Sequence, residues 1–81
     1  MPFFVYILKS EKSGRSYIGH TVDLPKRLIE HNSGKNIATK GKGPWQIVYQ
    51  EQFETRSAAS QRERFFKTIN GRLELKALGI L

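Results

Sequence analysis

Two tyrosines, an arginine and a histidine stand at spacings that could bring them together for chemistry. Tyr6 and Tyr17 lie in two short apolar runs separated by a polar turn, so a tight hairpin would place their phenols on neighbouring strands. Arg27 and His31 stand four residues apart, and on a helix they would share a face that could bind an anion. Simpler interpretations stay open, because tyrosine is common in strands and an arginine and a histidine can both face solvent.

One carboxylate has a defined place beside an apolar stripe. Glu63 stands one helical turn after Ala59 and one turn before Lys67, so its side chain is expected near the buried side of a helix. The simpler interpretation is a surface Glu–Lys pair, which contributes at most a few tenths of a kcal/mol. Spacing alone leaves the role of Glu63 open.

The elements that must position these side chains can be predicted from apolar patterning. Residues 3–8 form a block of β-branched and aromatic residues that is too short for a free-standing helix. Residues 16–22 return after a turn that contains Gly14. The two runs therefore predict an antiparallel hairpin, although the sequence does not fix the register that decides whether the tyrosines share a face.

A helix is predicted directly after the hairpin, over residues 24–32. Asp23 is a good N-cap residue, and Pro25 falls in the first turn, where its missing N–H is not needed. Gly34 is the expected left-handed terminator. This helix would carry Arg27 and His31.

A basic loop and a third strand are expected next. Residues 33–44 contain three glycines, one proline and three lysines with little apolar content, which indicates a flexible loop. Lys40 and Lys42 are candidate phosphate contacts, although such a loop can also be a solvated connection. Residues 45–50 predict the strand. Its large residues would share one face: Trp45, Ile47 and Tyr49.

Two helices are predicted to complete the chain. Thr55 or Ser57 can cap the first, which is expected over residues 58–69 and ends at Asn70-Gly71. A short last helix is expected over residues 72–78. The side chains expected to face the sheet from the first helix are Ala58, Phe65, Phe66 and Ile69.

Length, composition and charge limit the class of protein. A chain of 81 residues is expected to form one domain, residues 1–81, with a single modest core. It contains no cysteine, which excludes disulfides and thiolate zinc sites. No apolar run approaches the roughly 20 residues of a membrane span, and no signal segment is evident, so a cytoplasmic protein with no membrane contact is expected.

The net charge of +7, from 14 basic and 7 acidic residues, indicates a polyanionic partner. The basic residues are spread along the chain and do not line one amphipathic helix, which favours nucleic acid over a membrane surface. The alternative is a basic surface that serves only solubility.

Taken in order, these residues resemble the GIY-YIG nuclease domain, and more narrowly its small stand-alone bacterial branch. The resemblance covers nearly the whole chain. It rests on five elements: Val5-Tyr6-Ile7, Tyr17-Ile18-Gly19, Arg27, His31, and the stretch that contains Ala59, Glu63 and Lys67. One departure is that Val5 stands where the name-giving motif has glycine. The resemblance implies an α/β (α+β) fold with a central three-stranded antiparallel sheet flanked by about three helices.

The resemblance also implies roles for the site residues. Tyr6 would act as general base on a water molecule or pass its proton onward, and Tyr17 would position or assist it. Arg27 would hold the scissile phosphate, with His31 as a hydrogen-bonding helper. Glu63 would bind one Mg²⁺ or Mn²⁺ ion on the side of the leaving group. One ion fits better than two, because the other acidic residues are scattered.

The leading function is therefore a metal-dependent endonuclease acting on DNA, or on a branched, nicked or single-stranded form of it, with DNA favoured over RNA. Two alternatives stay open: a nucleic-acid-binding module with little or no turnover, and a basic protein-interaction domain. Retention of both tyrosines and the carboxylate favours the enzyme, since binding alone would not need them. The expected contacts with nucleic acid are Arg27, Lys35, Lys40, Lys42 and Lys67.

Overall fold

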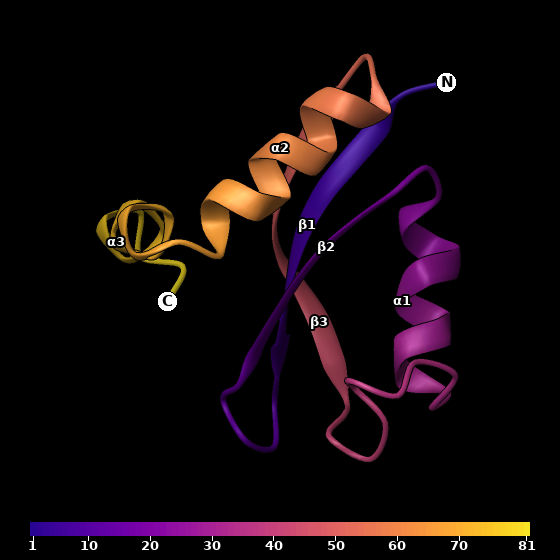
Figure 1. Cartoon of the computed structure of the whole chain (residues 1–81). Coiled ribbons are helices and arrows are strands. Elements are labelled where there is room, and N and C mark those ends of the chain that lie inside the picture. Colours follow the sequence, from indigo (N-terminus) through magenta and orange to yellow (C-terminus); the bar gives the residue numbers. More distant parts are fainter.

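The computed structural model describes residues 1–81 and contains three strands and three helices (Figure 1). In chain order they are β1 (Phe3–Ser10), β2 (Ser16–Thr21), α1 (Leu24–Asn32), β3 (Trp45–Phe53), α2 (Arg56–Phe66) and α3 (Ile69–Ala77). The strands form one antiparallel sheet in the order β2-β1-β3. The predicted α+β fold, with a three-stranded antiparallel sheet and three flanking helices, is confirmed.

The central strand β1 supplies apolar side chains to both faces of the sheet. Val5 and Ile7 pack in one buried cluster with Phe66 of α2 and Leu75 of α3. Tyr6 and Leu8 belong to a second cluster on the opposite face, together with side chains from α1 and the start of β3. The sheet therefore has an α1 face and an α2 face, and these two names are kept below (Figure 1).

The register of the hairpin decides where the tyrosines point. Tyr6 pairs with Gly19 and Leu8 pairs with Tyr17 across β1 and β2. Directly paired residues point to the same face of a sheet, so Tyr6 and Tyr17 both lie on the α1 face. The predicted hairpin is confirmed, and the register supplies the shared face that the sequence left open.

Strand β3 corrects the expectation that Trp45, Ile47 and Tyr49 share one face. Its register against β1 shifts between Ile7 and Leu8, which pair with Tyr49 and Ile47 respectively. One extra residue at this β-bulge reverses the alternation of side chains. Trp45 and Ile47 consequently pack on the α1 face, whereas Tyr49 packs on the α2 face.

Helix α1 begins and ends as expected. The Asp23 carboxylate accepts a hydrogen bond from the backbone N–H of Lys26 at 3.1 Å, and Pro25 lies in the first turn. Gly34, just beyond the helix, has a φ of 80°, in the left-handed region that favours glycine. These caps fix the helix on which Arg27 and His31 stand.

The junction of α2 and α3 differs from the expected one. Helix α2 ends at Phe66, and Thr68 caps α3 by accepting a hydrogen bond from the Gly71 N–H at 3.1 Å. Asn70 and Gly71 lie inside the first turn of α3 and do not break a helix. A β-carbon at Gly71 would stand 1.9 Å from the Phe65 carbonyl oxygen, so this glycine permits a close crossing of the two helices.

This junction also changes which side chains face the sheet. Ala59 is fully buried in the core, whereas Ala58 is only half-buried. Ile69 belongs to α3 and is 79% exposed, so its expected place against the sheet is wrong. Phe66 is fully buried and Phe65 packs beside it, as expected. No helix in the structure is long and apolar enough to span a membrane.

Candidate functional site

Three of the expected site residues meet on the α1 face. The Tyr6 hydroxyl lies 3.0 Å from Nε2 of His31, and Nε of Arg27 donates a hydrogen bond to the same hydroxyl at 3.3 Å. Tyr6 and His31 are almost fully buried, with 1% and 2% of their surface exposed. The helix-face spacing of Arg27 and His31 thus brings both side chains onto one phenol oxygen.

Gly19 makes room for the tyrosine pair. A β-carbon at this position would stand 2.7 Å from the Tyr6 hydroxyl oxygen and 3.1 Å from the Tyr17 ring. No side chain fits there without displacing a ring, which gives the glycine of the Tyr-Ile-Gly run a steric reason. The two ring centroids consequently approach to 6.3 Å.

Tyr17 is the more accessible phenol of the two. Its ring centroid lies 4.7 Å from that of His31, so it packs on the same buried imidazole. Tyr17 is only half-buried, and its hydroxyl has no hydrogen-bond partner within the chain, so that hydroxyl is free for water or a ligand. The two tyrosines are therefore close but differ in what they can reach.

Thr39 is the second hydrogen-bond partner of His31. Its hydroxyl lies 2.8 Å from Nδ1 of His31 and 3.4 Å from the Asn36 carbonyl oxygen. Both ring nitrogens of His31 are therefore hydrogen-bonded, Nδ1 to Thr39 and Nε2 to Tyr6. In the tautomer with its proton on Nδ1, the imidazole donates to Thr39 and its Nε2 accepts from the Tyr6 hydroxyl.

Sequence reasoning missed Thr39, because it lies in the basic loop expected to be a flexible connection. In the structure it is 1% exposed, and its carbonyl oxygen accepts a hydrogen bond from Nε1 of Trp45 at 3.1 Å. The Ser10 hydroxyl also bonds the Lys42 carbonyl oxygen. No pattern within residues 33–44 separates Thr39 from its polar neighbours, since only the tertiary fold brings it to His31.

Burial and the Arg27 charge set the protonation of this group. Burial raises the pKa of Tyr6 above its usual value, against the lowering effect of the hydrogen bond from Arg27. Burial, followed by the positive charge of Arg27, lowers the pKa of His31. The hydrogen bond to Tyr6 raises the pKa of Arg27. Near neutral pH the site thus holds a protonated phenol, a neutral imidazole and a guanidinium cation.

Arg27 keeps donors available after making its contacts within the chain. Its Nε bonds Tyr6, and its Nη1 donates to Oε1 of Glu30 at 3.1 Å. A guanidinium has five N–H donors, so most of its outer edge remains unused. That edge lines a cleft of about 430 Å³ at the ends of β2 and α1.

Glu63 lies on the α2 face, held by the side chains of His20 and Lys67. Its Oε1 is 2.5 Å from Nδ1 of His20, and its Oε2 accepts from Nζ of Lys67 at 2.8 Å. Burial works to raise the pKa of Glu63, but the hydrogen bonds from Lys67 and His20 outweigh it and lower that pKa. The carboxylate is therefore ionised at neutral pH. The surface pair with Lys67 that spacing suggested is present.

His20 joins the two halves of the candidate site, and sequence reasoning did not single it out. It pairs with Val5 across the hairpin, so its side chain lies on the α2 face, where it contacts Glu63. It also lines the 430 Å³ cleft, as Arg27 does. Its position directly after the Tyr-Ile-Gly run was the available signal, but the contact with a residue 43 positions away depends on the fold.

The donors present suit a hard divalent cation only in part. No group of three or more His, Cys, Asp or Glu side chains comes together in this chain. Mg²⁺ commonly keeps several waters and takes one or two carboxylates plus phosphate oxygens, so the single ionised carboxylate of Glu63 fits that pattern. Both of its oxygens are engaged by His20 and Lys67, and an ion would have to share or replace those contacts.

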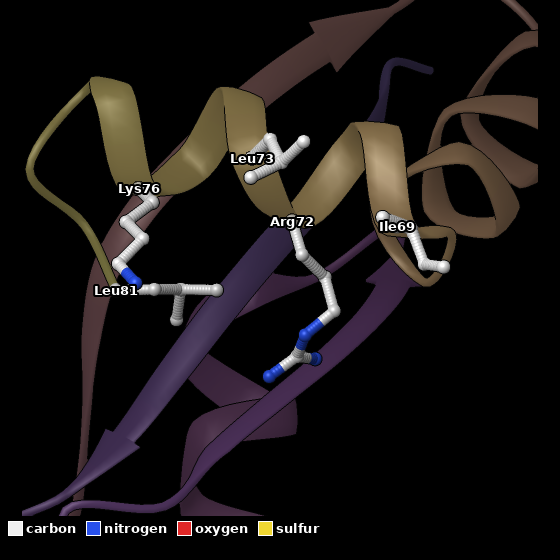
Figure 2. Close-up of a pocket in the computed structure, with 5 residues that line it drawn as sticks. All are labelled: Ile69, Arg72, Leu73, Lys76 and Leu81. Atoms are coloured by element: carbon white, nitrogen blue, oxygen red, sulfur yellow. The ribbon is translucent and has the colours of Figure 1, made fainter.

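A largely apolar cleft lies away from all of these residues. Figure 2 shows it between α3 and the last residue of the chain, with a volume of about 420 Å³. Its lining residues are Ile69, Arg72, Leu73, Lys76 and Leu81. None of them is a phenol, imidazole or carboxylate side chain, so this cleft offers no acid, base or anionic metal ligand.

The four expected lysine contacts do not join the buried group. Lys35, Lys40 and Lys42 are exposed on the basic loop, and Nζ of Lys42 donates to the Ala38 carbonyl oxygen at 3.3 Å. Lys67 is 53% exposed and bonds Glu63. The loop follows the C-terminal end of α1, whereas the cleft beside Arg27 opens at the N-terminal end.

Comparisons with known proteins agree with this arrangement. The chain matches the family model described as the GIY-YIG catalytic domain over residues 2–75. It is 42% identical over 76 residues to a UPF0213 protein of Staphylococcus saprophyticus, covering 93% of this chain and 92% of that protein. It is 44% identical over 66 residues to a UPF0213 protein of Bacillus pumilus, covering 80% and 66% respectively.

A solved structure shows the same fold. The solution NMR structure of the UPF0213 protein BH0048 from Bacillus halodurans is similar with a TM-score of 0.58 and 32% identity. The match covers 96% of this chain and 85% of that one. The sequence resemblance, the fold and the clustering of Tyr6, Arg27 and His31 therefore agree, and the chain belongs to the GIY-YIG family, a nuclease family, among its small UPF0213 proteins.

Proposed function

We propose that the chain, acting as one domain over residues 1–81, is a metal-dependent endonuclease that hydrolyses phosphodiester bonds in DNA. The observation that carries this proposal is the hydrogen-bonded series from Arg27 through Tyr6 to His31 beside a cleft. Such a series combines a cation for a phosphate with a route for a proton. A binding protein needs the cation but not the route.

Arg27 would bind the scissile phosphate from the wall of the cleft. Its planar guanidinium can offer two parallel N–H donors to two phosphoryl oxygens, and its charge opposes the negative charge that grows in the transition state. The bonds to Tyr6 and Glu30 hold the side chain in one orientation. No reorganisation of this group is then needed during the reaction.

The two tyrosines would share the activation of water. Tyr17, whose hydroxyl is free, would orient the attacking water. Tyr6 would accept the proton from that water while its own hydroxyl proton passes to Nε2 of His31, 3.0 Å away. This exchange avoids a free phenolate, which the raised pKa of Tyr6 disfavours at neutral pH.

Glu63 would hold one Mg²⁺ or Mn²⁺ ion next to His20, which lines the cleft. When bound, such an ion supplies positive charge to phosphoryl and leaving oxygens. The lowered pKa of Glu63 keeps the carboxylate ionised and able to act as a ligand. His20 and Lys67 hold it in place until then. Only one carboxylate lies at this position, which supports a one-metal site.

A second candidate function is a nucleic-acid-binding module of the same fold with little turnover. The observation that favours it is the occupation of both Glu63 oxygens by side chains of the chain itself, His20 and Lys67. If those contacts persist, the carboxylate has no free position for an ion. The +7 charge would still bind a polyanion.

A cleavage assay separates the two functions. Labelled single-stranded, duplex, nicked and branched DNA, with matching RNA, would be incubated with Mg²⁺, Mn²⁺ or EDTA. We expect cleavage of DNA with either ion and none in EDTA. Glu63→Gln should abolish it, whereas Glu54→Gln, which removes an exposed carboxylate in no ion pair, should not. Binding without cleavage of any substrate would favour the second function.

A further inference from the structure

We infer that the cleft beside Arg27 is a groove for a nucleic-acid strand, in which Arg56 and Lys26 contact phosphates that flank the scissile one. The ligand in this inference rests on the proposed function. Four polar side chains that line the cleft carry the inference: His20, Lys26, Arg27 and Arg56. They come from the end of β2, the first turn of α1 and the start of α2.

Arg56 is held over the cleft by the first residue of the sheet. Its guanidinium carbon lies 4.9 Å from the centroid of the Phe3 ring, in a cation–π contact. Stacking uses the flat face of the guanidinium and leaves the N–H donors at its edge available. Arg56 is exposed and forms no ion pair within the chain. It is therefore a positioned cation without a partner.

Lys26 supplies a second cation without a partner. Its side chain is exposed in the first turn of α1, and it forms no ion pair within the chain. Arg27, the next residue, already bonds Tyr6 and lines the same cleft. A phosphate at Arg27 would thus share the cleft with two further cationic side chains, those of Lys26 and Arg56.

The two carboxylates in the cleft, Asp23 and Glu30, offset only part of the charge of Lys26, Arg27 and Arg56. The Asp23 side chain caps α1 by accepting from the Lys26 backbone N–H at 3.1 Å. Glu30 pairs with Arg27 at 3.1 Å. Each carboxylate is already satisfied by a partner of its own. The cations that remain free are those of Arg56 and Lys26, and the free edge of Arg27 faces the same space.

The cleft also connects both halves of the candidate site. Two of its lining residues make the link: Arg27 bonds Tyr6, and His20 bonds Glu63. A strand lying in this groove would carry one phosphate between Arg27 and the Glu63 side, and its neighbours past Lys26 and Arg56. The basic loop that contains Lys35, Lys40 and Lys42 lies at the other end of α1 and would add only general attraction.

The test compares two arginines of the same helix. Arg56 and Arg64 are both exposed on α2 and neither forms an ion pair, but only Arg56 lines the cleft. Binding of a fluorescein-labelled oligonucleotide, single-stranded and duplex, would be measured by anisotropy in EDTA between about 50 and 200 mM KCl. EDTA keeps the result independent of cleavage.

We expect Arg56→Gln to lower affinity about tenfold, the loss for one charge-assisted contact. The slope of log K against log salt should become shallower by about 0.9 on duplex and about 0.7 on single strands. Arg64→Gln should leave the slope unchanged. Equal effects of the two variants would overturn the inference, since Arg56 would then be only one member of the basic surface.

A second pair covers the case in which loss of the Phe3 contact unfolds Arg56→Gln. The Lys26 side chain is exposed, so Lys26→Gln should stay folded. Its slope of log K against log salt should become shallower by a similar amount. Lys12→Gln, in the turn at the far end of the hairpin, is its control. If Lys26→Gln and Lys12→Gln give the same slope of log K against log salt, the inferred nucleic-acid groove is contradicted.

These binding results are distinct from the outcome of the cleavage assay. In one outcome the wild-type chain cleaves DNA, but Arg56→Gln and Lys26→Gln bind like their controls. That outcome would support the nuclease proposal and contradict the inferred groove. In the other outcome the wild-type chain does not cleave, but the salt dependence of binding changes when Arg56 or Lys26 is replaced. That outcome would contradict the nuclease proposal and support a groove that binds a nucleic-acid strand.

Discussion

The α1 face and the α2 face of the sheet hold their polar site residues in different ways. On the α1 face, Tyr6 and His31 are almost fully buried and bonded to each other. On the α2 face, the Glu63 side chain is 18% exposed, and its partner Lys67 is 53% exposed. Buried hydrogen bonds are geometrically fixed, whereas half-exposed ion pairs are weak and easily exchanged. A proton route needs the first property, and a ligand for a bound ion needs the second.

Tyr6→Phe tests the fixed side of this comparison and should have the largest effect. The ring would still pack, but the proton acceptor is lost, so single-turnover cleavage should fall by about 10²- to 10⁴-fold with binding nearly unchanged. His31 Nε2 would also lose its partner, which should lower the free energy of unfolding by about 1–3 kcal/mol. Tyr17→Phe should reduce cleavage without that loss of stability.

The matched control for Tyr6→Phe is Tyr49→Phe on the α2 face. The Tyr49 hydroxyl donates to Glu51 at 2.5 Å and takes no part in the candidate site. It should leave the rate of cleavage unchanged. Wild-type rates for both Tyr6→Phe and Tyr17→Phe would show that the two phenols only pack, and a larger effect from Tyr17→Phe would make Tyr17 the base.

Arg27→Lys should have the next largest effect on cleavage, because it keeps the charge but loses the planar fork. Long-range attraction to nucleic acid should survive, since the net charge stays at +7. Cleavage should fall by about tenfold to a thousandfold if the lost stabilisation is roughly 1.4–4 kcal/mol. Lys42→Arg is the charge-neutral control. Similar, near-wild-type rates for both variants would place Arg27 among general surface cations.

Acidification should affect the two faces in different pH ranges. The pKa of His31 is lowered from 6.5 in the folded state, so the unfolded chain binds that proton first and stability falls as the pH drops below about 6.5. The pKa of Glu63 is lowered from 4.5, so its contribution is present above that value and is lost at more acidic pH. Urea unfolding at stepped pH would measure both.

Two single variants show which residue causes the loss of stability in each pH range. His31→Gln should flatten the stability profile just below pH 6.5 and leave the more acidic part unchanged. Glu63→Gln should flatten only the part below pH 4.5. A profile in which neither variant changes its own range would contradict the assignment of fixed and exchangeable polar groups to the two faces.

Lys67→Met should give the smallest effect, and in the opposite direction. If Lys67 competes with a divalent ion for Glu63, its removal should tighten Mn²⁺ binding by about two- to fivefold, which corresponds to one exposed ion pair. Electron paramagnetic resonance of free Mn²⁺, without nucleic acid, would measure it. Lys76→Met on α3 is the control. Weaker Mn²⁺ binding would mean that Lys67 orients the carboxylate and does not compete.

Local patterns predicted the hairpin and α1 because their signals lie in adjacent residues. Asp23, Pro25 and Gly34 define α1 by backbone chemistry alone. The resemblance then supplied the four residues that hairpin and helix bring together on the α1 face: Tyr6, Tyr17, Arg27 and His31. The signals for the hairpin and the helix lie in short stretches of sequence, whereas the contacts of Tyr6 with Arg27 and His31 span 21 and 25 residues and follow from the packing of α1 on the sheet.

The features that were missed have no local signal in the residues that form them. Thr39 matters only because the loop folds back on His31, and His20 only because α2 crosses the end of β2. The bulge in β3, which turns Tyr49 to the α2 face, is set by the pairing with β1 and has no signal in residues 45–50. Such placements are decided by tertiary packing, which overrides local alternation.

The close approach at Gly19 means that the site depends on an empty volume as well as on functional groups. Gly19→Ala would remove no donor, acceptor or charge, yet its methyl group would lie 2.7 Å from the Tyr6 hydroxyl. The ring would have to move away from Arg27 and His31 together. A chain that carries every reactive side chain of this family but alanine here would therefore keep the composition of the site and lose its assembly.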